Sequence, residues 1–343
     1  MYRLKSNVLV FALLTGILFS QGGDIPEVVT KVATAAGNWL KIETSARAIG
    51  MGGAYVAAGE GINGIPYNPA SIAYIKNSEG YYSRSNYLAG ITHNVMSYGV
   101  RFGSSDYFGV HLFYLDSGLM PVTNEWYPDG TGEEFNVLSM AFRMTYGRRM
   151  TDRLKLGFSL NYIRDQIYTT SMQTLAFDVG SNFDTGIYGF KLGMSVTNFG
   201  PEVRYHGEGL DVSVPGELNA DSTLQKVTKP FPLPLTFRLG VKNDIMGPNG
   251  TFIKNQAHRL TVSMDGVNPS DYTVYGSVGF EYGWMDFAFV RIGTHIGHDT
   301  AGLSAGGGIK LKARGGMGVS VDYAYVDYGL LKLTHQAGLS LEF

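Results

Sequence analysis

Two short runs carry the side chains that most often bind metals or attack substrates. One is "HIGHD", with two imidazoles and a carboxylate at His295, His298 and Asp299, which are side-chain types that ligate zinc. The other is "GLSAG", which places Ser304 in the Gly-x-Ser-x-Gly pattern of hydrolase nucleophiles, a pattern that needs a sharp strand-to-helix turn. The histidines fall in an expected loop, and Ser304 opens an expected strand. We therefore predict solvated histidines, a wall residue at Ser304, and neither a metal site nor an enzyme.

A glycine-rich stretch at 45–73 could form a second kind of site, a loop that binds phosphate. It reads "SARAIGMGGAYVAAGEGINGIPYNPASIA". A dinucleotide loop needs Gly-x-Gly-x-x-Gly between a strand and a helix; Gly50 and Gly52 fit, but Tyr55 stands at the third position. No parallel-sheet pattern surrounds the stretch. We interpret Gly50, Gly52 and Gly53 as packing residues in a confined space, where only small side chains fit.

The composition is unusual for a soluble protein of this size. Of 343 residues only 16% are charged, against roughly 25% in soluble domains, while the chain holds 22 Tyr, 19 Phe and 46 Gly. A net charge of −2 gives no basic surface, which excludes a nucleic-acid partner. Cysteine is absent, so disulfides and thiolate metal sites are excluded, and we expect no cofactor.

The first residues predict export. Arg3 and Lys5 precede an uncharged apolar run at 8–19, and small residues follow it, which is the pattern of a secretory signal peptide. We place the signal peptide at 1–22, with cleavage after Ser20 or Gly22. No later stretch approaches 18 consecutive apolar residues, so we expect no membrane-spanning helix.

The rest of the chain alternates with a period of two. "GMGVSVDYAY", for example, sets Met317, Val319, Val321 and Tyr323 against small and polar residues, as a strand with one apolar face does. About fourteen such segments are expected, at 79–88, 94–103, 106–115, 134–147, 153–164, 172–183, 187–198, 233–243, 257–266, 272–283, 285–294, 302–312, 316–326 and 332–343.

These segments predict an all-β fold, a transmembrane antiparallel β-barrel of about fourteen strands. Each is around ten residues long, which a tilted strand needs to cross a bilayer, and their number is even. Only a closed sheet satisfies every backbone group in lipid. A barrel of this width is not filled by its own wall, so we assign 79–343 to the barrel and the Gly/Ala-rich segment 23–78 to a plug in its lumen.

The connections predict the orientation. With both termini in the periplasm, the odd-numbered connections face outward, and long ones are expected there at 116–133, 199–232 and 295–301. The even-numbered ones are mostly tight, except for 244–256.

Two further segments suggest roles at the barrel ends. The chain ends in "QAGLSLEF", where Gly338, Leu341 and Phe343 resemble the signal read by the machinery that assembles outer-membrane barrels; an ordinary last strand is the alternative. The expected loop at 116–135 carries Met120, Trp126 and Tyr127, and loop aromatics are typical of binding hot spots. The same residues equally fit a loop folded over the barrel mouth.

Several stretches together resemble one family. They are "ARAIGMGGAYVA", "YNPASIA", "YLDSGLMPVTNEWYPDGTGEEF", "LGFSLNYIRDQI" and "LPLTFRLGVKND". From about Ile42 to Phe343 the chain resembles the PorV/PorQ family of outer-membrane proteins, within the wider FadL-like group of plugged fourteen-strand barrels. The most specific piece is Asn68, Pro69 and Ala70, which the resemblance implies is the plug and hinge motif.

The resemblance implies two different functions. A PorV-like protein is a type IX secretion accessory, whose outer loops bind the translocon barrel and the C-terminal domains of exported cargo. A FadL-like protein instead transports a hydrophobic small molecule, such as a fatty acid, passively. Either reading implies a monomer in the outer membrane of a Gram-negative-type bacterium, in contact with its lipid.

Overall fold

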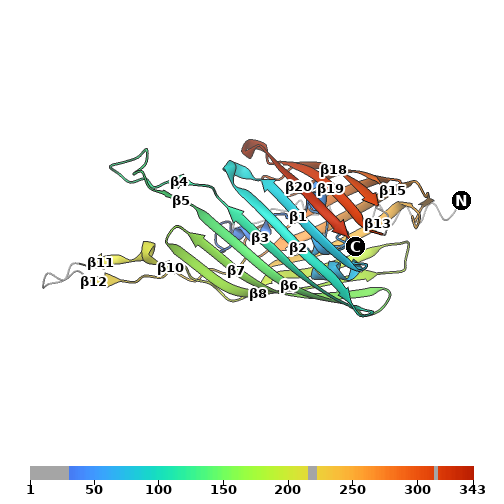
Figure 1. The fold of residues 1–343 in the computed structure, drawn as a ribbon, viewed down its shortest axis with the longest axis horizontal. Helices are drawn as coiled ribbons and strands as arrows, with labels where there is room; N and C mark the ends of the chain where they lie inside the picture. Colours follow the sequence, from blue (N-terminus) through green and yellow to red (C-terminus); the bar gives the residue numbers. More distant parts are fainter. Residues whose placement is uncertain (1–30, 215–221, 313–315) are drawn as a thin grey trace, which may run out of the picture. The chain divides into compact units, whose positions relative to one another are not determined.

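The chain closes into an antiparallel barrel of fourteen strands (Figure 1). The computed structural model describes residues 31–214, 222–312 and 316–343, so the predicted signal peptide lies outside the described residues. The wall strands are β1 (Ser78–Asn86), β2 (Thr92–Phe102), β3 (Asp106–Asp116), β6 (Val137–Arg149), β7 (Leu154–Ile167), β8 (Thr170–Asp184), β9 (Lys191–Phe199), β13 (Thr236–Gly247), β15 (His258–Pro269), β16 (Tyr275–Trp284), β17 (Ala288–Ile296), β18 (Leu303–Lys312), β19 (Gly318–Asp327) and β20 (Leu333–Glu342).

Pairing between the first and last strands closes the sheet. β1 pairs with β20 from Glu79↔Glu342 to Asn86↔His335, and β9 joins β8 to β13. No edge is left open in this ring, so each strand finds partners on both sides. The prediction of an all-β, fourteen-strand barrel is confirmed.

Six predicted strands begin two to four residues later than expected, and tight turns explain two of these differences. β9 starts at Lys191 rather than 187, because Tyr188 and Gly189 both have positive φ and form a turn. β17 starts at Ala288 rather than 285, because Met285 and Asp286 adopt φ of 53° and 52°. Two consecutive left-handed residues build a tight hairpin turn whose twist matches that of the strands, which no apolar alternation reveals.

Short elements occupy the loops and the interior. They are η1 (Asn38–Lys41), α2 (Ala46–Gly50), η2 (Ile62–Gly64), η3 (Pro69–Tyr74), η4 (Leu88–Gly90), β4 (Met120–Pro121), β5 (Glu134–Phe135), β10 (His206–Gly207), η5 (Glu208–Leu210), β11 (Val212–Val214), β12 (Ser222–Leu224), β14 (Ile253–Lys254) and η6 (Gly329–Leu331). Among the described residues, no helix is long and apolar enough to cross a membrane.

The two ends of the barrel differ in their connections. One end, called the loop end below, carries the two long loops 117–136 and 200–235, and Figure 1 shows their β-hairpins reaching far beyond the wall. The third long loop expected there is shorter, since β17 ends at Ile296 and β18 begins at Leu303. The other end, called the turn end, carries mostly short turns and the C-terminus; 248–257 is its longest described connection, as predicted.

The wall is apolar outside and polar inside. Outward positions of successive strands carry exposed Met96, Phe158, Leu239, Phe280 and Ile292. Inward positions carry buried hydroxyl, amide and charged side chains, including Ser83, Asn161, Ser263, Glu281 and Arg291. This polarity is the reverse of that in a soluble protein, and it follows the alternation expected from the sequence.

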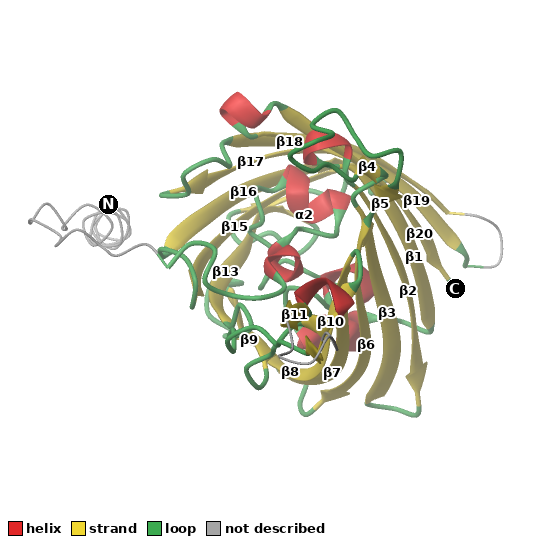
Figure 2. Cartoon of the chain, turned by 90° about the vertical axis from the view of Figure 1, so that its left-hand side faces the viewer, coloured by secondary structure: helices red, strands yellow, loops and turns green. Residues whose placement is uncertain are grey.

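Residues 32–77, called the inner segment below, lie inside the ring of strands (Figure 2). Its helix α2 packs on β17 to β20, and η3 packs on β3, β6, β7 and β8, so the segment spans the lumen between opposite walls. It reaches the wall at the turn end, where Ser78 begins β1.

Candidate functional site

On one side of the lumen, ion pairs hold the inner segment to the wall. The Arg47 guanidinium on α2 donates to both oxygens of Glu281 on β16, at 2.7 and 2.8 Å. Arg259 and Arg291 donate to the same carboxylate at 2.8 and 2.7 Å, and Arg291 also reaches Asp322 at 2.5 Å. These groups lie under β15 to β19, which form the charged side of the lumen.

Two further carboxylates tie the segment to the same region of the wall. Asp265 on β15 accepts the backbone N–H groups of Tyr55 and Val56 at 2.6 and 2.8 Å. Glu60 pairs with Lys242 at 2.8 Å. Burial alone would raise the pKa of Glu60, but Lys242 and the nearby Lys191 outweigh it and hold the pKa below its usual range. Glu60 is therefore ionised at any physiological pH.

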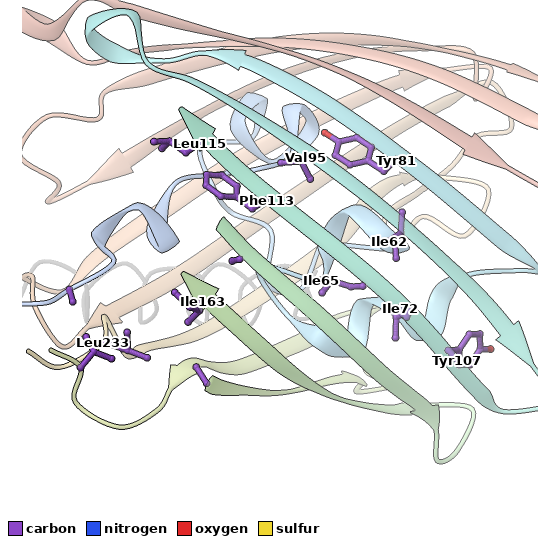
Figure 3. Close-up of a cluster of buried hydrophobic side chains, with 14 of the residues drawn as sticks. Ile62, Ile65, Ile72, Tyr81, Val95, Tyr107, Phe113, Leu115, Ile163 and Leu233 are labelled. Atoms are coloured by element: carbon purple, nitrogen blue, oxygen red, sulfur yellow. The ribbon is translucent and has the colours of Figure 1, made fainter. Parts of the chain in front are cut away.

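The opposite side of the lumen, under β1 to β3 and the adjoining strands β6 to β8, carries an apolar cluster (Figure 3). Ile62, Ile65 and Ile72 of the inner segment pack there against wall side chains. Along β3 the cluster runs from Tyr107 near the turn end to Leu115 near the loop end. At 3.3 Å per residue this is about 26 Å along the strand, or about 20 Å along the membrane normal at a tilt of about 40°, which is most of the apolar band of an outer membrane.

Wall glycines let the inner segment approach closely, but differently on the two sides. On the charged side, a Cβ at Gly293 would collide with backbone atoms of Met51 and Gly52. On the apolar side, a Cβ at Gly99 would meet only the Cδ1 atoms of Ile75 and Ile62, at 2.6 and 2.8 Å. The contact is thus rigid under β17 and compliant under β2, because the ends of side chains rotate and backbone does not. Under β7 the contact is rigid again, since a Cβ at Gly157 would collide with the backbone of Pro69 and Ala70.

The three predicted packing glycines all lie in these close contacts. Gly52 has a φ of +61° and lies against the Thr294 backbone, while Gly53 has a φ of +71° and lies against Glu43. Gly50 lies against Gly306 of the wall. A larger residue at Gly52 or Gly53 would be strained by the backbone as well as by the lack of space.

The Asn68-Pro69-Ala70 motif is fixed to the wall. The Asn68 side chain caps η3 by accepting the Ala70 N–H at 3.0 Å, and its Nδ2 donates to the Val56 and Ser181 carbonyls at 2.9 and 3.0 Å. Pro69 occupies the first turn of η3, where its missing N–H costs nothing. This geometry makes the motif an anchor on β8, and the hinge role implied by the resemblance stays a prediction.

A cavity of about 350 Å³ lies at the loop end between the inner segment and the wall, and is called the mouth cavity below. Aromatic and polar side chains line it, among them Tyr87, Tyr272, Tyr275, Tyr328, His295 and His298. At its side, Lys41 pairs with Asp271 at 2.6 Å, and Glu43 lies 3.5 Å from His295. Such a volume suits a small organic ligand.

The "HIGHD" histidines line this cavity, and the expectation that they are solvated is wrong. His295 ends β17 with its side chain 8% exposed, and its ring lies 5.8 Å from that of Tyr275. His298 is half-buried, and its Nδ1 accepts the Ala301 N–H at 3.1 Å. Burial and the neighbouring His295 lower the pKa of His298, which keeps it neutral. In the described part of the chain, no three His, Asp or Glu side chains are placed to hold a metal.

The remaining predicted residues lie at the barrel ends and in the wall. Trp126 and Tyr127 are 85% and 62% exposed in the loop 117–136, while Met120 is half-buried and pairs with Phe135 in the β4–β5 hairpin. This exposure does not fit a loop folded over the mouth. Ser304 is buried in β18 and donates to the Gly293 carbonyl, as a wall residue does.

The C-terminal residues complete the last strand. Gly338 lies against the Tyr81 ring, and Leu341 pairs with Gly80 of β1. Phe343 is exposed, and its N–H donates to the Ser78 carbonyl at 2.9 Å. Their role as an assembly signal stays a prediction.

The charged side of the lumen is the feature that sequence reasoning missed. A signal for it exists, because Glu281 lies between Phe280 and Tyr282, and Arg291 between Val290 and Ile292. A charge between two outward apolar residues must face the lumen. The sequence does not say which of these charges meet.

Comparison with solved structures supports the fold, whereas comparison by sequence finds no match. No protein-family model and no curated protein sequence matches the chain. Solved structures do match. The toluene transporter TodX of Pseudomonas putida superposes with a TM-score of 0.57 at 11% identity, over 88% of this chain and 97% of that one.

Two more solved structures match with similar TM-scores and identities. A FadL homologue of Pseudomonas aeruginosa has a TM-score of 0.53 at 12% identity, over 87% of this chain and 97% of its own. The CymD monoaromatic hydrocarbon channel has a TM-score of 0.54 at 12% identity, over 86% and 96%. At such identities the likeness establishes a FadL-like barrel fold. None of these neighbours is named as a PorV or PorQ protein.

Proposed function

We propose that the protein is an outer-membrane barrel that lets a small hydrophobic molecule cross passively, with the inner segment as its plug. The observation that carries this proposal is the apolar cluster, which follows one side of the lumen from Leu115 to Tyr107. The apolar outer wall supports membrane insertion, and the structural neighbours are transporters or channels for hydrophobic compounds.

The plug must shift for a molecule to pass, because the inner segment contacts both sides of the lumen. The compliant contacts under β2 and β3 favour movement on the apolar side. There, Ile72 and Ile62 meet the wall through flexible side-chain ends. The charged side holds the segment by ion pairs and backbone contacts, so it acts as the fixed support.

A reversible cross-link tests this proposal. The chain has no cysteine, so a pair introduced by Gly99→Cys and Ile62→Cys on the apolar side is the only thiol pair. An added Cβ at Gly99 would lie 3.7 Å from the Ile62 Cγ1, the position that a cysteine sulfur takes, within reach of a disulfide. Uptake of labelled toluene and oleate is measured in cells lacking their own hydrophobe channel.

We expect the unmodified protein to raise uptake of at least one compound, and oxidation of the double variant to reduce it toward the empty-vector level. Reduction of the disulfide should restore uptake. The single variants Gly99→Cys and Ile62→Cys control for the substitutions themselves. An unmodified protein that raises neither uptake contradicts the transport proposal, and uptake that oxidation leaves unchanged contradicts the moving plug.

A protein-binding loop is the second candidate, favoured by the exposure of Trp126 and Tyr127. The type IX secretion role expected from the sequence resemblance has no support from the comparisons. A pull-down from outer membranes with the native chain and with a Trp126→Ala/Tyr127→Ala variant tests it. A translocon barrel or exported cargo captured by the native chain and lost with the variant would support this second candidate over the first.

A further inference from the structure

The mouth cavity holds two buried hydrogen-bond acceptors that have no partner. Asp271 is 2% exposed; its Oδ2 accepts from Lys41 Nζ at 2.6 Å, while its Oδ1 has no hydrogen-bond partner. Nε2 of His295 lies 3.5 Å from Glu43 Oε1, so a ring that carries its proton on Nε2 presents Nδ1 as an acceptor, and Nδ1 also has no partner. A buried acceptor left unpaired is unfavourable, so both atoms favour a donor from a ligand.

The rest of the cavity is built from rings. Tyr272, Tyr275 and His298 pack against one another with centroids 5.1 to 6.2 Å apart, and Tyr87 and Tyr328 form a second pair at 6.1 Å. The faces and edges of such rings make favourable contacts with another aromatic ring. The volume of about 350 Å³ fits a single substituted ring rather than a long alkyl chain.

The charges favour a neutral ligand. Asp271 is already paired with the Lys41 cation, and Glu43 lies 3.5 Å from the Nε2 of His295. An anionic ligand would be repelled by both carboxylates.

We infer that the mouth cavity binds a neutral monocyclic aromatic carrying hydrogen-bond donors, such as a hydroxylated benzene, with Asp271 and His295 as the acceptors. This inference rests on the proposed transport function in one respect, because it takes the cavity as the first binding site of the transported compound. A plain hydrocarbon would leave both acceptors unpaired, so the cavity selects for the donor.

Binding of phenol, resorcinol, toluene and benzaldehyde to the full chain in nanodiscs tests the inference by calorimetry or ligand-observed NMR. All four probes carry one aromatic ring. Phenol has one hydrogen-bond donor, resorcinol has two, toluene has none, and benzaldehyde has only an acceptor. We expect phenol and resorcinol to bind about tenfold more tightly than toluene, as one recovered buried hydrogen bond implies.

The variant Asp271→Asn should reverse this selectivity. Lys41 can only donate, so it takes the amide oxygen and leaves the NH₂ group at the position of Oδ1. Phenol should lose its advantage over toluene, and benzaldehyde should gain one. A purely structural role for Asp271 would weaken all four probes alike. The exposed loop residue Asp129 supplies the matched control, Asp129→Asn, which should change nothing.

Three outcomes would overturn the inference. They are equal binding of phenol and toluene by the native chain, unchanged selectivity in Asp271→Asn, and an equal loss of all probes in that variant. If Asp271→Asn does not fold, His295→Phe keeps a ring, removes the second acceptor, and should lower phenol affinity alone. Selective binding without uptake would instead refute the transport proposal and leave the cavity assignment standing.

Discussion

The two sides of the lumen hold the same inner segment by opposite means. Under β15 to β19, Arg47 and Glu281 lock it by charge, and wall glycines meet its backbone. Under β1 to β3, isoleucine side chains such as Ile62 and Ile72 pack against the wall through their ends. Charge pairs tolerate little displacement, whereas apolar contacts can be remade after a shift. The difference suggests a plug that is fixed on one side and able to yield on the other.

The largest expected effect comes from breaking the charged side at its centre. Glu281→Gln removes the carboxylate that Arg47, Arg259 and Arg291 share, leaving buried cations short of a counter-charge. We expect a loss of about 3–5 kcal/mol in the free energy of unfolding, measured by denaturant titration of the barrel in detergent. Glu125→Gln in an exposed loop is the control. A loss as small as in this control would show that the network does not support the fold.

A matched glycine pair compares the two sides directly. Gly293→Ala places a methyl group into inner-segment backbone and should cost about 1–3 kcal/mol and admit dye or antibiotic through the barrel. Gly99→Ala meets only the ends of Ile75 and Ile62, so we expect less than half that cost and little leakage. Gly266→Ala, whose nearest neighbour lies at 3.9 Å, is the neutral reference. Equal leakage from the first two variants would remove the distinction between rigid and compliant sides.

A smaller change probes the apolar side alone. Ile72 is fully buried, and Ile72→Val removes the Cδ1 methyl group that packs against Gly109. We expect about 0.5–1.5 kcal/mol of destabilisation together with faster hydrophobe uptake, because the plug yields more easily there. Uptake that falls or stays constant would indicate that passage does not follow this side.

The smallest effect is a local dependence on pH at the mouth. Burial, and then His295, lower the pKa of His298 from its ordinary 6.5, so the unfolded chain binds more protons as pH falls through this value. The contribution of His298 is therefore present above about pH 6.5 and decreases below it. Protonation also removes the acceptor for the Thr300 and Ala301 N–H groups.

Hydrogen exchange at these two amides should therefore accelerate as the pH falls below about 6.5, after correction for intrinsic rates. The variant His298→Asn keeps an acceptor that does not titrate, and its profile should be flat. A native profile as flat as that of the variant would mean that His298 does not hold the loop.

The sequence alone determined the wall. Period-two alternation over ten-residue segments fixes which side chains face out, because successive Cβ atoms point to opposite faces of a strand. That rule located fourteen strands and put Val321 and Tyr323 on the outer face, where both are exposed. Its strand boundaries were wrong by up to four residues, as at the turn Met285-Asp286, where backbone conformation rather than polarity decides.

Only the tertiary structure decided what meets inside. Strand alternation requires Glu281 and Arg291 to face the lumen, but their association with Arg47 depends on a segment more than 200 positions away in the chain. His295 was expected in solvent, yet its position at the end of β17 turns it toward Tyr275 and the mouth cavity. Alternation is a local property of one strand, whereas the contents of a closed barrel are set by how all its strands and its inner segment come together.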